Sequence, residues 1–178
     1  MSLFDPFPEL RTPRLRLRAL ALADAPEMFR HECDPRVTRY FGRAPVASLA
    51  AMEAKIAGIA ADVAAGKVIN WVLADAATGE LIGSACLWHW DPSRGCAELG
   101  YWLAPSRWGR GLVGEALVPV LEFGFARMAL ACVEARVDPD NVASVRVLIR
   151  LGFTGQPDAS RVPDEHGAHE TMYVLGRR

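Results

Sequence analysis

The residues best suited to chemistry form one short glycine-rich run, from Gly109 to Gly114. It reads G-R-G-L-V-G, which satisfies the G-x-G-x-x-G pattern of dinucleotide-binding loops. Glycines at this spacing favour a tight turn that opens a helix, where free backbone N–H groups and the positive end of the helix dipole face an anion. Arg107 and Arg110 add positive charge beside the turn. The run therefore predicts a binding site for a phosphate or pyrophosphate group.

The surroundings of the run argue against the two commonest glycine-rich phosphate loops. A nicotinamide-binding loop follows its strand directly, whereas Pro105 to Trp108 intervene here, and only 64 residues (178 minus 114) follow Gly114. Glu134 lies about 20 residues beyond the loop, but in the middle of an expected strand rather than at its end. A P-loop requires Lys where this sequence has Glu115. A nicotinamide-dependent oxidoreductase therefore stays open only as an alternative.

Two histidine-containing stretches have the residue types of a metal site without its spacing. His31 to Asp34 are consecutive, and consecutive side chains cannot all converge on one ion. Glu165, His166 and His169 form an H-x-x-H pattern that lacks two further ligands at metal spacing. We therefore predict no metal site.

Three aromatic side chains, Trp88, His89 and Trp90, crowd one expected strand. Alternation along a strand would put Trp88 and Trp90 on the same face. We interpret them as core packing or as one wall of a substrate cleft rather than as a stacking platform for a cofactor.

Composition limits the chain to one expected domain, residues 1–178. Of its 178 residues 51% are hydrophobic, which is enough for one core. A formal net charge of −1 gives no reason to expect a nucleic-acid or membrane partner. No apolar run approaches the roughly 20 residues of a membrane span, and the N-terminus lacks an apolar signal-peptide region. Because Cys33, Cys86, Cys96 and Cys132 follow no disulfide or metal spacing, we expect reduced thiols in a cytoplasmic protein.

Hydrophobic periodicity places the glycine run between a strand and a helix. At residues 14–20 arginines alternate with leucines, which predicts a strand whose arginines face solvent or, alternatively, an acidic partner. Helices are expected to begin at Asp24, at Ser48, at about Gly111 and at Asn141. Further strands are expected at 68–75, 81–90, 96–104, 131–138, 153–156 and 171–176. This order predicts an α/β fold with a mostly antiparallel first half and a β-α-β unit in the middle.

The order of several motifs resembles that of the GNAT N-acetyltransferases, and more narrowly their RimJ/RimL-type branch. A strand, Pro105 and then W-G-R-G before E-A is similar to that family's acetyl-CoA pyrophosphate loop. L-R-T-P-R-L-R-L-R-A-L at 10–20, A-E-L-G-Y-W-L-A-P at 97–105, D-P-D-N-V-A-S-V-R-V-L-I-R-L-G-F at 138–153 and H-E-T-M-Y-V-L-G-R-R at 169–178 agree as well. The superfamily writes its loop Q/R-x-x-G-x-G/A, and with Gly111 aligned, Trp108 and Val113 depart from it. The resemblance spans almost the whole chain. It implies the acyl-CoA N-acyltransferase fold, a mixed and mostly antiparallel sheet flanked by helices, with two splayed central strands.

The resemblance further implies that acetyl-CoA is the acetyl donor and that its pantetheine arm lies between the splayed strands. The backbone of Trp102 and Leu103 would bind the pantetheine and the acetyl carbonyl, and Asn141 would hold the arm. The implied cofactor-binding residues are Trp102, Leu103, Arg107, Trp108, Gly109, Arg110, Gly111, Leu112, Val113, Gly114 and Asn141.

Two catalytic residues are predicted from the same resemblance. Glu98 shares a strand face with Trp102 and is the candidate general base for the amine, acting directly or through a water. Ser144 matches the family's N-x-x-S near the cofactor sulfur. Many members place a Tyr acid where this chain has Leu148, so Ser144 becomes the candidate proton donor, unless the thiolate leaves unaided.

The implied activity is transfer of an acetyl group to a primary amine, on a protein N-terminus or a small molecule, by a monomer or homodimer. An acyl-CoA-binding sensor without turnover is the alternative from a different class. We expect the loops at 31–45 and 155–169 to determine the acceptor.

Overall fold

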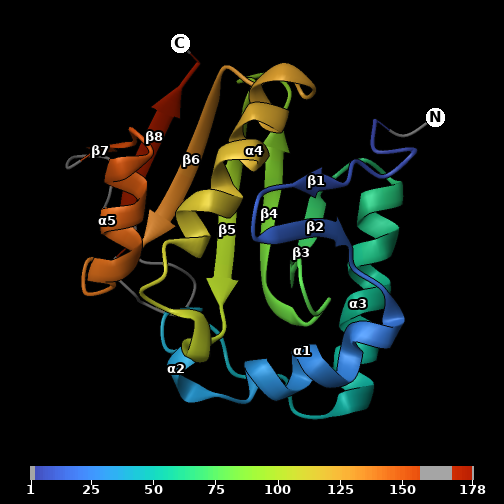
Figure 1. The fold of residues 1–178 in the computed structure, drawn as a ribbon. Helices are drawn as coiled ribbons and strands as arrows, with labels where there is room; N and C mark the ends of the chain where they lie inside the picture. Colours follow the sequence, from blue (N-terminus) through green and yellow to red (C-terminus); the bar gives the residue numbers. More distant parts are fainter. Residues whose placement is uncertain (1–2, 157–169, 178) are drawn as a thin grey trace.

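The computed structural model describes residues 3–156 and 170–177, which form one eight-stranded sheet with helices on both faces (Figure 1). The strand order is β1-β2-β3-β4-β5-β6-β8-β7, and every neighbouring pair is antiparallel except β5 and β6. The strands are β1 (Leu10–Arg11), β2 (Leu15–Ala19), β3 (Ile69–Asp75), β4 (Leu81–Asp91), β5 (Cys96–Leu103), β6 (Cys132–Val137), β7 (Thr154–Gln156) and β8 (Thr171–Gly176). The predicted mixed sheet and its central β-α-β unit are confirmed.

The helices that follow Ser48 and Asn141 have side-chain caps, as predicted, each of which satisfies one of the first backbone N–H groups. Ser48 Oγ accepts from the Ala51 N–H (3.1 Å), and Asn141 Oδ1 accepts from the Ser144 N–H (3.2 Å). The helices are α1 (Ala25–Glu32), α2 (Pro35–Thr38), α3 (Leu49–Ala64), α4 (Leu112–Ala126) and α5 (Val142–Arg150), with short 3-10 turns at Leu22–Asp24 and Pro105–Arg107. Within the described part of the chain, no helix is long and apolar enough to cross a membrane.

Two hydrophobic clusters fix the helices to opposite faces of the sheet. The larger one packs Leu117 of α4 and Leu148 of α5 against sheet residues that include Trp71. The smaller one packs Met28 of α1 and Met52 of α3 against the other face. Since α4 connects β5 to β6, the glycine-rich run lies between the end of β5 and the start of α4, beside the two central strands (Figure 1).

The arginine stripe of the N-terminal strand is an ion-paired surface. Arg14 pairs with Glu115, Arg16 with Glu9, and Arg18 with Asp24. Asp24 occupies the N-cap position of α1 as predicted, but its carboxylate accepts from Arg18 and from the Ala21 N–H instead of capping the helix. The arginines face solvent as predicted, with the Arg14 and Arg16 side chains 51% and 48% exposed, and because each is paired with an acid of this chain they are not free for an acidic partner.

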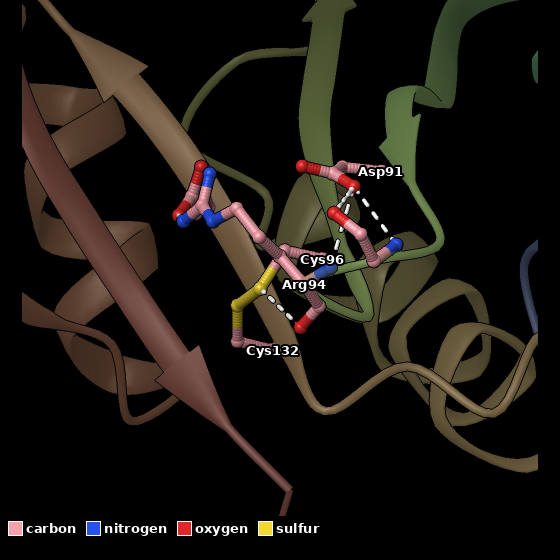
Figure 2. The surroundings of a disulfide bond; sticks show 6 residues. Asp91, Arg94, Cys96 and Cys132 are labelled. Atoms are coloured by element: carbon pink, nitrogen blue, oxygen red, sulfur yellow. Dashed lines mark hydrogen bonds and ion pairs between the residues drawn. A yellow bond between two sulfur atoms is a disulfide. The ribbon is translucent and has the colours of Figure 1, made fainter.

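A disulfide bond joins Cys96 to Cys132 at the beginnings of β5 and β6 (Figure 2). The expectation of four reduced thiols is therefore wrong for this pair. The parallel register puts the two residues opposite one another, with Cα atoms 4.8 Å apart. Their separation of 36 residues follows no familiar framework pattern, so the pairing depends on a strand register that local sequence does not show. Cys33 and Cys86 are free thiols.

Candidate active site

The central feature of the site is a gap between β5 and β6. The strands pair over residues 96–98 and 132–134 only, and the last pair joins Glu98 to Glu134. Beyond it β5 continues to Leu103 and β6 to Val137 without pairing (Figure 1). The splayed central strands that the resemblance implied are thus confirmed. A cleft of about 2130 Å³ includes this gap and is lined from both faces of the sheet.

Alternation of backbone groups decides which β5 residues face the gap. The Ala104 N–H donates to the Ile82 carbonyl (2.7 Å), which continues the register in which Leu103 lies opposite Gly83. In an antiparallel pair every second residue bonds to the partner strand, so the backbone groups of Trp102 point to β4. Those of Tyr101 and Leu103 point into the gap. Of the two residues predicted to supply backbone donors there, Leu103 is placed to do so and Trp102 is not.

The glycine-rich run forms the turn that precedes α4, as predicted. Gly111 is the N-cap residue of α4 and has a left-handed backbone, with φ 73°. A side chain at this position would be strained by the backbone conformation, and the nearest atom to its Cβ would be Arg14 Nη2, at 3.9 Å. Leu112, Val113 and Gly114 then begin the helix, whose first N–H groups have no partners within it. The geometry is therefore that of an anion-binding helix terminus.

Glu115 holds this turn to the N-terminal strands. Its carboxylate accepts from Thr12 Oγ1 (2.6 Å), from the Arg14 N–H (2.9 Å) and from Arg14 Nε (2.6 Å). Arg14 also donates to the Arg110 carbonyl (3.0 Å) inside the turn. Burial alone would raise the pKa of Glu115, but the hydrogen bonds from Thr12 and Arg14 outweigh it, so the pKa is lowered. The acid at the helix N-terminus is thereby neutralised by Arg14, which leaves the turn open to an anion.

The side chains beside the turn differ in their hydrogen-bond and ion-pair partners. Arg107 pairs with Asp75 (3.1 Å) and with Glu80 (2.7 Å). Arg110 is exposed. The indole of Trp108 donates to the Leu103 carbonyl (2.7 Å) and so fastens the turn to the end of β5. Of the two predicted arginines, Arg107 lines the cleft but is ion-paired, whereas Arg110 lines a separate hollow beside Arg14.

Across the gap from β5, the first turn of α5 carries Asn141 and Ser144. The Ser144 hydroxyl lies 2.5 Å from the hydroxyl of Tyr101 on β5, which bridges the two elements. Burial raises the pKa of Tyr101 to about 12. Leu148, in the position of the family's usual Tyr, is fully buried in the core. Sequence reasoning missed Tyr101, although its place on the strand before the turn gave the signal.

Glu98 lies at the last paired position of β5, where the gap begins. Its Oε2 is 3.2 Å from His89 Nδ1 and 3.7 Å from Arg136 Nε. The Glu98 side chain is 15% exposed. Glu98 shares a strand face with Trp102, as predicted, and that face is the one covered by α1 and α3.

The Cys86 sulfur and the Trp88 indole pack over Gly100 on this face, between Glu98 and Trp102. A Cβ atom at Gly100 would lie 2.9 Å from the Cys86 sulfur and 3.7 Å from Trp88 Nε1. Burial raises the pKa of the Cys86 thiol to about 12, so the thiol stays protonated near neutral pH and is a poor nucleophile. The cleft therefore has a small, uncharged floor next to Glu98.

The crowded aromatic segment of β4 is split by a bulge. Trp88 lies opposite Glu98, but Asp91 lies opposite Cys96, so β4 has one residue more than β5 between these two pairs. Trp88 therefore shares the face of Glu98, whereas Trp90 packs against the core cluster on the other face. The prediction that both tryptophans share a face is wrong. Trp88 is one wall of the cleft.

Residues 31–45 line the cleft in part, which fits their predicted role near the acceptor. Buried Glu32 pairs with Lys55 of α3 and with Arg43 (2.9 Å), while His31 Nε2 lies 3.3 Å from the Leu81 carbonyl. His31 and Glu32 thus have different partners and do not converge on one point. Tyr40 donates to the carbonyl of Asp140, just before α5 (3.2 Å). Glu165, His166 and His169 lie outside the described residues, as does most of the 155–169 loop.

Comparison with known proteins identifies the family. The family model described as acetyltransferase (GNAT) domain matches residues 14–154. Uncharacterized N-acetyltransferase p20 of Bacillus licheniformis is 32% identical over 144 residues, 81% of each chain, and uncharacterized N-acetyltransferase YoaA of Bacillus subtilis strain 168 is 33% identical over 147 residues, 83% of each. A structure of RimL, a ribosomal L7/L12 α-N-protein acetyltransferase with coenzyme A, has a TM-score of 0.82 at 18% identity, covers 95% of this chain and 98% of its own, and so shares the fold. By the extent of the family match and the identity to both relatives, this chain belongs to the GNAT acetyltransferase family and is an N-acetyltransferase.

Proposed function

We propose that the protein transfers the acetyl group of acetyl-CoA directly to a primary amine, an N-terminal α-amino group of a protein or a small-molecule amine. The observation that carries the proposal is the single cleft that joins the anion-binding turn, the gap beyond Glu98 and the floor beside Gly100. The turn at Gly109–Gly114 would hold the pyrophosphate. The gap would hold the pantetheine, with Asn141 on its far side, and the amine would approach from the face of Glu98.

Direct transfer is favoured because no described cysteine suits a covalent acetyl intermediate. Cys86 reaches the cleft, but its thiol is buried and protonated. Cys96 and Cys132 are bonded to each other, and Cys33 lies on the surface outside the cleft. The amine nitrogen itself would therefore attack the thioester carbonyl.

Glu98 would remove the proton from the attacking amine. A free α-amino group has a pKa of roughly 7.7–8.0, so part of the substrate is already neutral near pH 7. The carboxylate then has only to accept the proton that the nitrogen releases as the C–N bond forms. The Glu98 carboxylate acts directly or through one water. The backbone N–H groups of Tyr101 and Leu103, which face the gap, are the donors for the negative oxygen that develops on the acetyl carbonyl.

Ser144 and Tyr101 would stabilise the departing thiolate together. The pKa of Tyr101 is about 12, whereas a thiol has a pKa of about 8.5, so complete proton transfer from this tyrosine is uphill by about 5 kcal/mol. A serine hydroxyl is a weaker acid still. The pair would therefore act by hydrogen bonding. Either hydroxyl can be the donor in their contact, and with Tyr101 as the donor to Ser144 Oγ the Ser144 proton is free to point at the sulfur.

A protein N-terminus as acceptor is supported by the fold that the chain shares with RimL, a ribosomal L7/L12 α-N-protein acetyltransferase. The test is a panel of N-terminal peptides and small amines with acetyl-CoA, read by release of free thiol. Amine-dependent thiol release is the expected result. Tight acetyl-CoA binding by calorimetry with no release for any amine would instead show a sensor, and an absence of acetyl-CoA binding would refute the proposed cofactor site.

A further inference from the structure

His89 has an unusual backbone for a residue with a side chain. Its φ is 45°, in the left-handed region, and it lies in the bulge of β4 between Trp88 and Asp91. Bulges next to active sites commonly redirect a side chain, and strained residues cluster at functional sites. The bulge is therefore a reason to ask what the His89 ring reaches.

The ring connects the shielded Glu98 carboxylate to solvent. His89 Nδ1 lies 3.2 Å from Glu98 Oε2, and the ring stacks on Trp88 with centroids 3.9 Å apart and planes at 21°. The His89 side chain is 66% exposed, against 15% for Glu98. The stacking holds the ring in place while most of it stays in contact with water.

The other charged groups around Glu98 do not offer the same route. Arg136 of β6 approaches the same oxygen at 3.7 Å but is always protonated and cannot accept a proton. Glu134, opposite Glu98 on β6, is engaged by Arg94. Lys55 of α3 is engaged by Glu32. Among the described groups near Glu98, His89 alone combines a hydrogen-bond contact with Glu98, a ring nitrogen that can accept a proton and exposure to solvent.

We propose that His89 carries to solvent the proton that Glu98 removes from the acceptor amine, an inference that rests on the proposed acetyl transfer. The amine nitrogen bonds to the acetyl carbon, its proton passes to Glu98, and the C–S bond breaks with its electron pair on sulfur. With the neutral ring protonated on Nε2, the proton on Glu98 then moves to His89 Nδ1, and the imidazolium returns to the neutral ring by losing one proton to water. An imidazole is ordinarily more basic than a carboxylate, so the transfer runs in the favourable direction. His89 acts through Glu98 and is a positioning residue rather than a catalytic one.

The test compares His89→Asn with the wild type in the thiol-release assay, using the amine from the acceptor panel that gives the highest wild-type rate. Asparagine tolerates a left-handed backbone and can still donate a hydrogen bond to Glu98, but it cannot relay a proton. We expect kcat to fall roughly 10- to 100-fold, with the KM for acetyl-CoA and the melting temperature unchanged. Because the site is open to water, added imidazole should restore the rate in proportion to its concentration.

Two results would overturn the relay. One is wild-type turnover in His89→Asn, which would mean that holding Glu98 is the whole role. The other is a slow variant that no concentration of imidazole or of a substituted imidazole restores. In a Glu98→Gln background the His89→Asn change should have no further effect, since no proton reaches the ring. Wild-type thiol release, measured in the same assay, tests the proposed function separately, so active wild type with an unaffected variant refutes the relay alone.

Discussion

Tyr101→Phe removes one hydroxyl and so tests most directly the contact between Tyr101 on β5 and Ser144 on α5. The hydroxyl makes a 2.5 Å contact with Ser144, and a hydrogen bond of this kind contributes about 1–2 kcal/mol. If that contribution supports the thiolate, turnover should fall roughly fivefold to thirtyfold. Acetyl-CoA affinity should change little, because the anion-binding turn is untouched. Tyr173→Phe, on β8 and with its ring against Gly155, is the matched control.

The leaving group provides the sharper measurement. Acyl donors whose thiols have a higher pKa depend more on stabilisation of the thiolate, so the Tyr101→Phe defect should grow along such a series. Ser144→Ala should show the same trend with a defect of roughly ten- to a hundredfold. The double variant should match Ser144→Ala alone, because Tyr101 acts through that serine. A defect that stays flat across the donors, or effects of the two changes that simply add, would refute the pairing.

The raised pKa of Tyr101 also predicts how stability depends on pH. Burial favours the neutral phenol, so its pKa is about 12 in the folded chain against an ordinary value of 10.0. The resulting stabilisation is fully present below pH 10 and is lost as the pH rises toward 12. Two pKa units correspond to about 3 kcal/mol. The difference in melting temperature between Tyr101→Phe and wild type should therefore change between pH 10 and 12 and stay constant between pH 7 and 9.

Three further changes address the turn and the base. Gly111→Val should weaken acetyl-CoA binding well over tenfold by calorimetry while the fold persists by circular dichroism, and normal binding would place the phosphate site elsewhere. Glu98→Gln should slow turnover about 10- to 10⁴-fold, less so as the pH rises above the amine pKa of roughly 7.7–8.0; an unchanged pH–rate profile would remove Glu98 from the mechanism. Glu115→Gln should lower the melting temperature at pH 7 and flatten the loss of stability as the pH falls through the lowered pKa, below the ordinary value of 4.5; a variant with the wild-type acid profile would contradict the role of its ion pair with Arg14.

The features predicted correctly from sequence are those encoded locally. Ser48 and Asn141 were recognised as caps because their side chains act within three residues of themselves. The turn at Gly111 could be predicted for the same reason, because its left-handed backbone favours glycine and the sequence has glycine there. The order of the motifs was enough to predict the fold, because it determines which strand precedes α4 and which follows it.

Features that depend on strand register or distant partners were missed. The alternation rule placed Trp90 on the wrong face because a bulge at His89, a residue that rarely adopts positive φ, shifts the count by one. Arg107 pairs with Asp75 and Glu80, which lie 32 and 27 positions before it in the sequence. The contact between Tyr101 and Ser144 spans 43 positions. Pairings of this range follow from the assembled sheet, and no local pattern contains them.

The disulfide closes the whole crossover from β5 through the phosphate turn and α4 into one covalent ring, because Cys96 and Cys132 stand at its two ends. A ring of this length lowers the conformational entropy of the unfolded chain, which stabilises the folded state by about 4 kcal/mol. It also changes what a single peptide-bond cut can do. A cut anywhere between the two cysteines opens the ring but leaves both fragments bonded, so the strand that carries Glu98 and the helix that begins at Leu112 cannot separate by diffusion. Damage within this crossover thus stays local until the sulfurs are reduced.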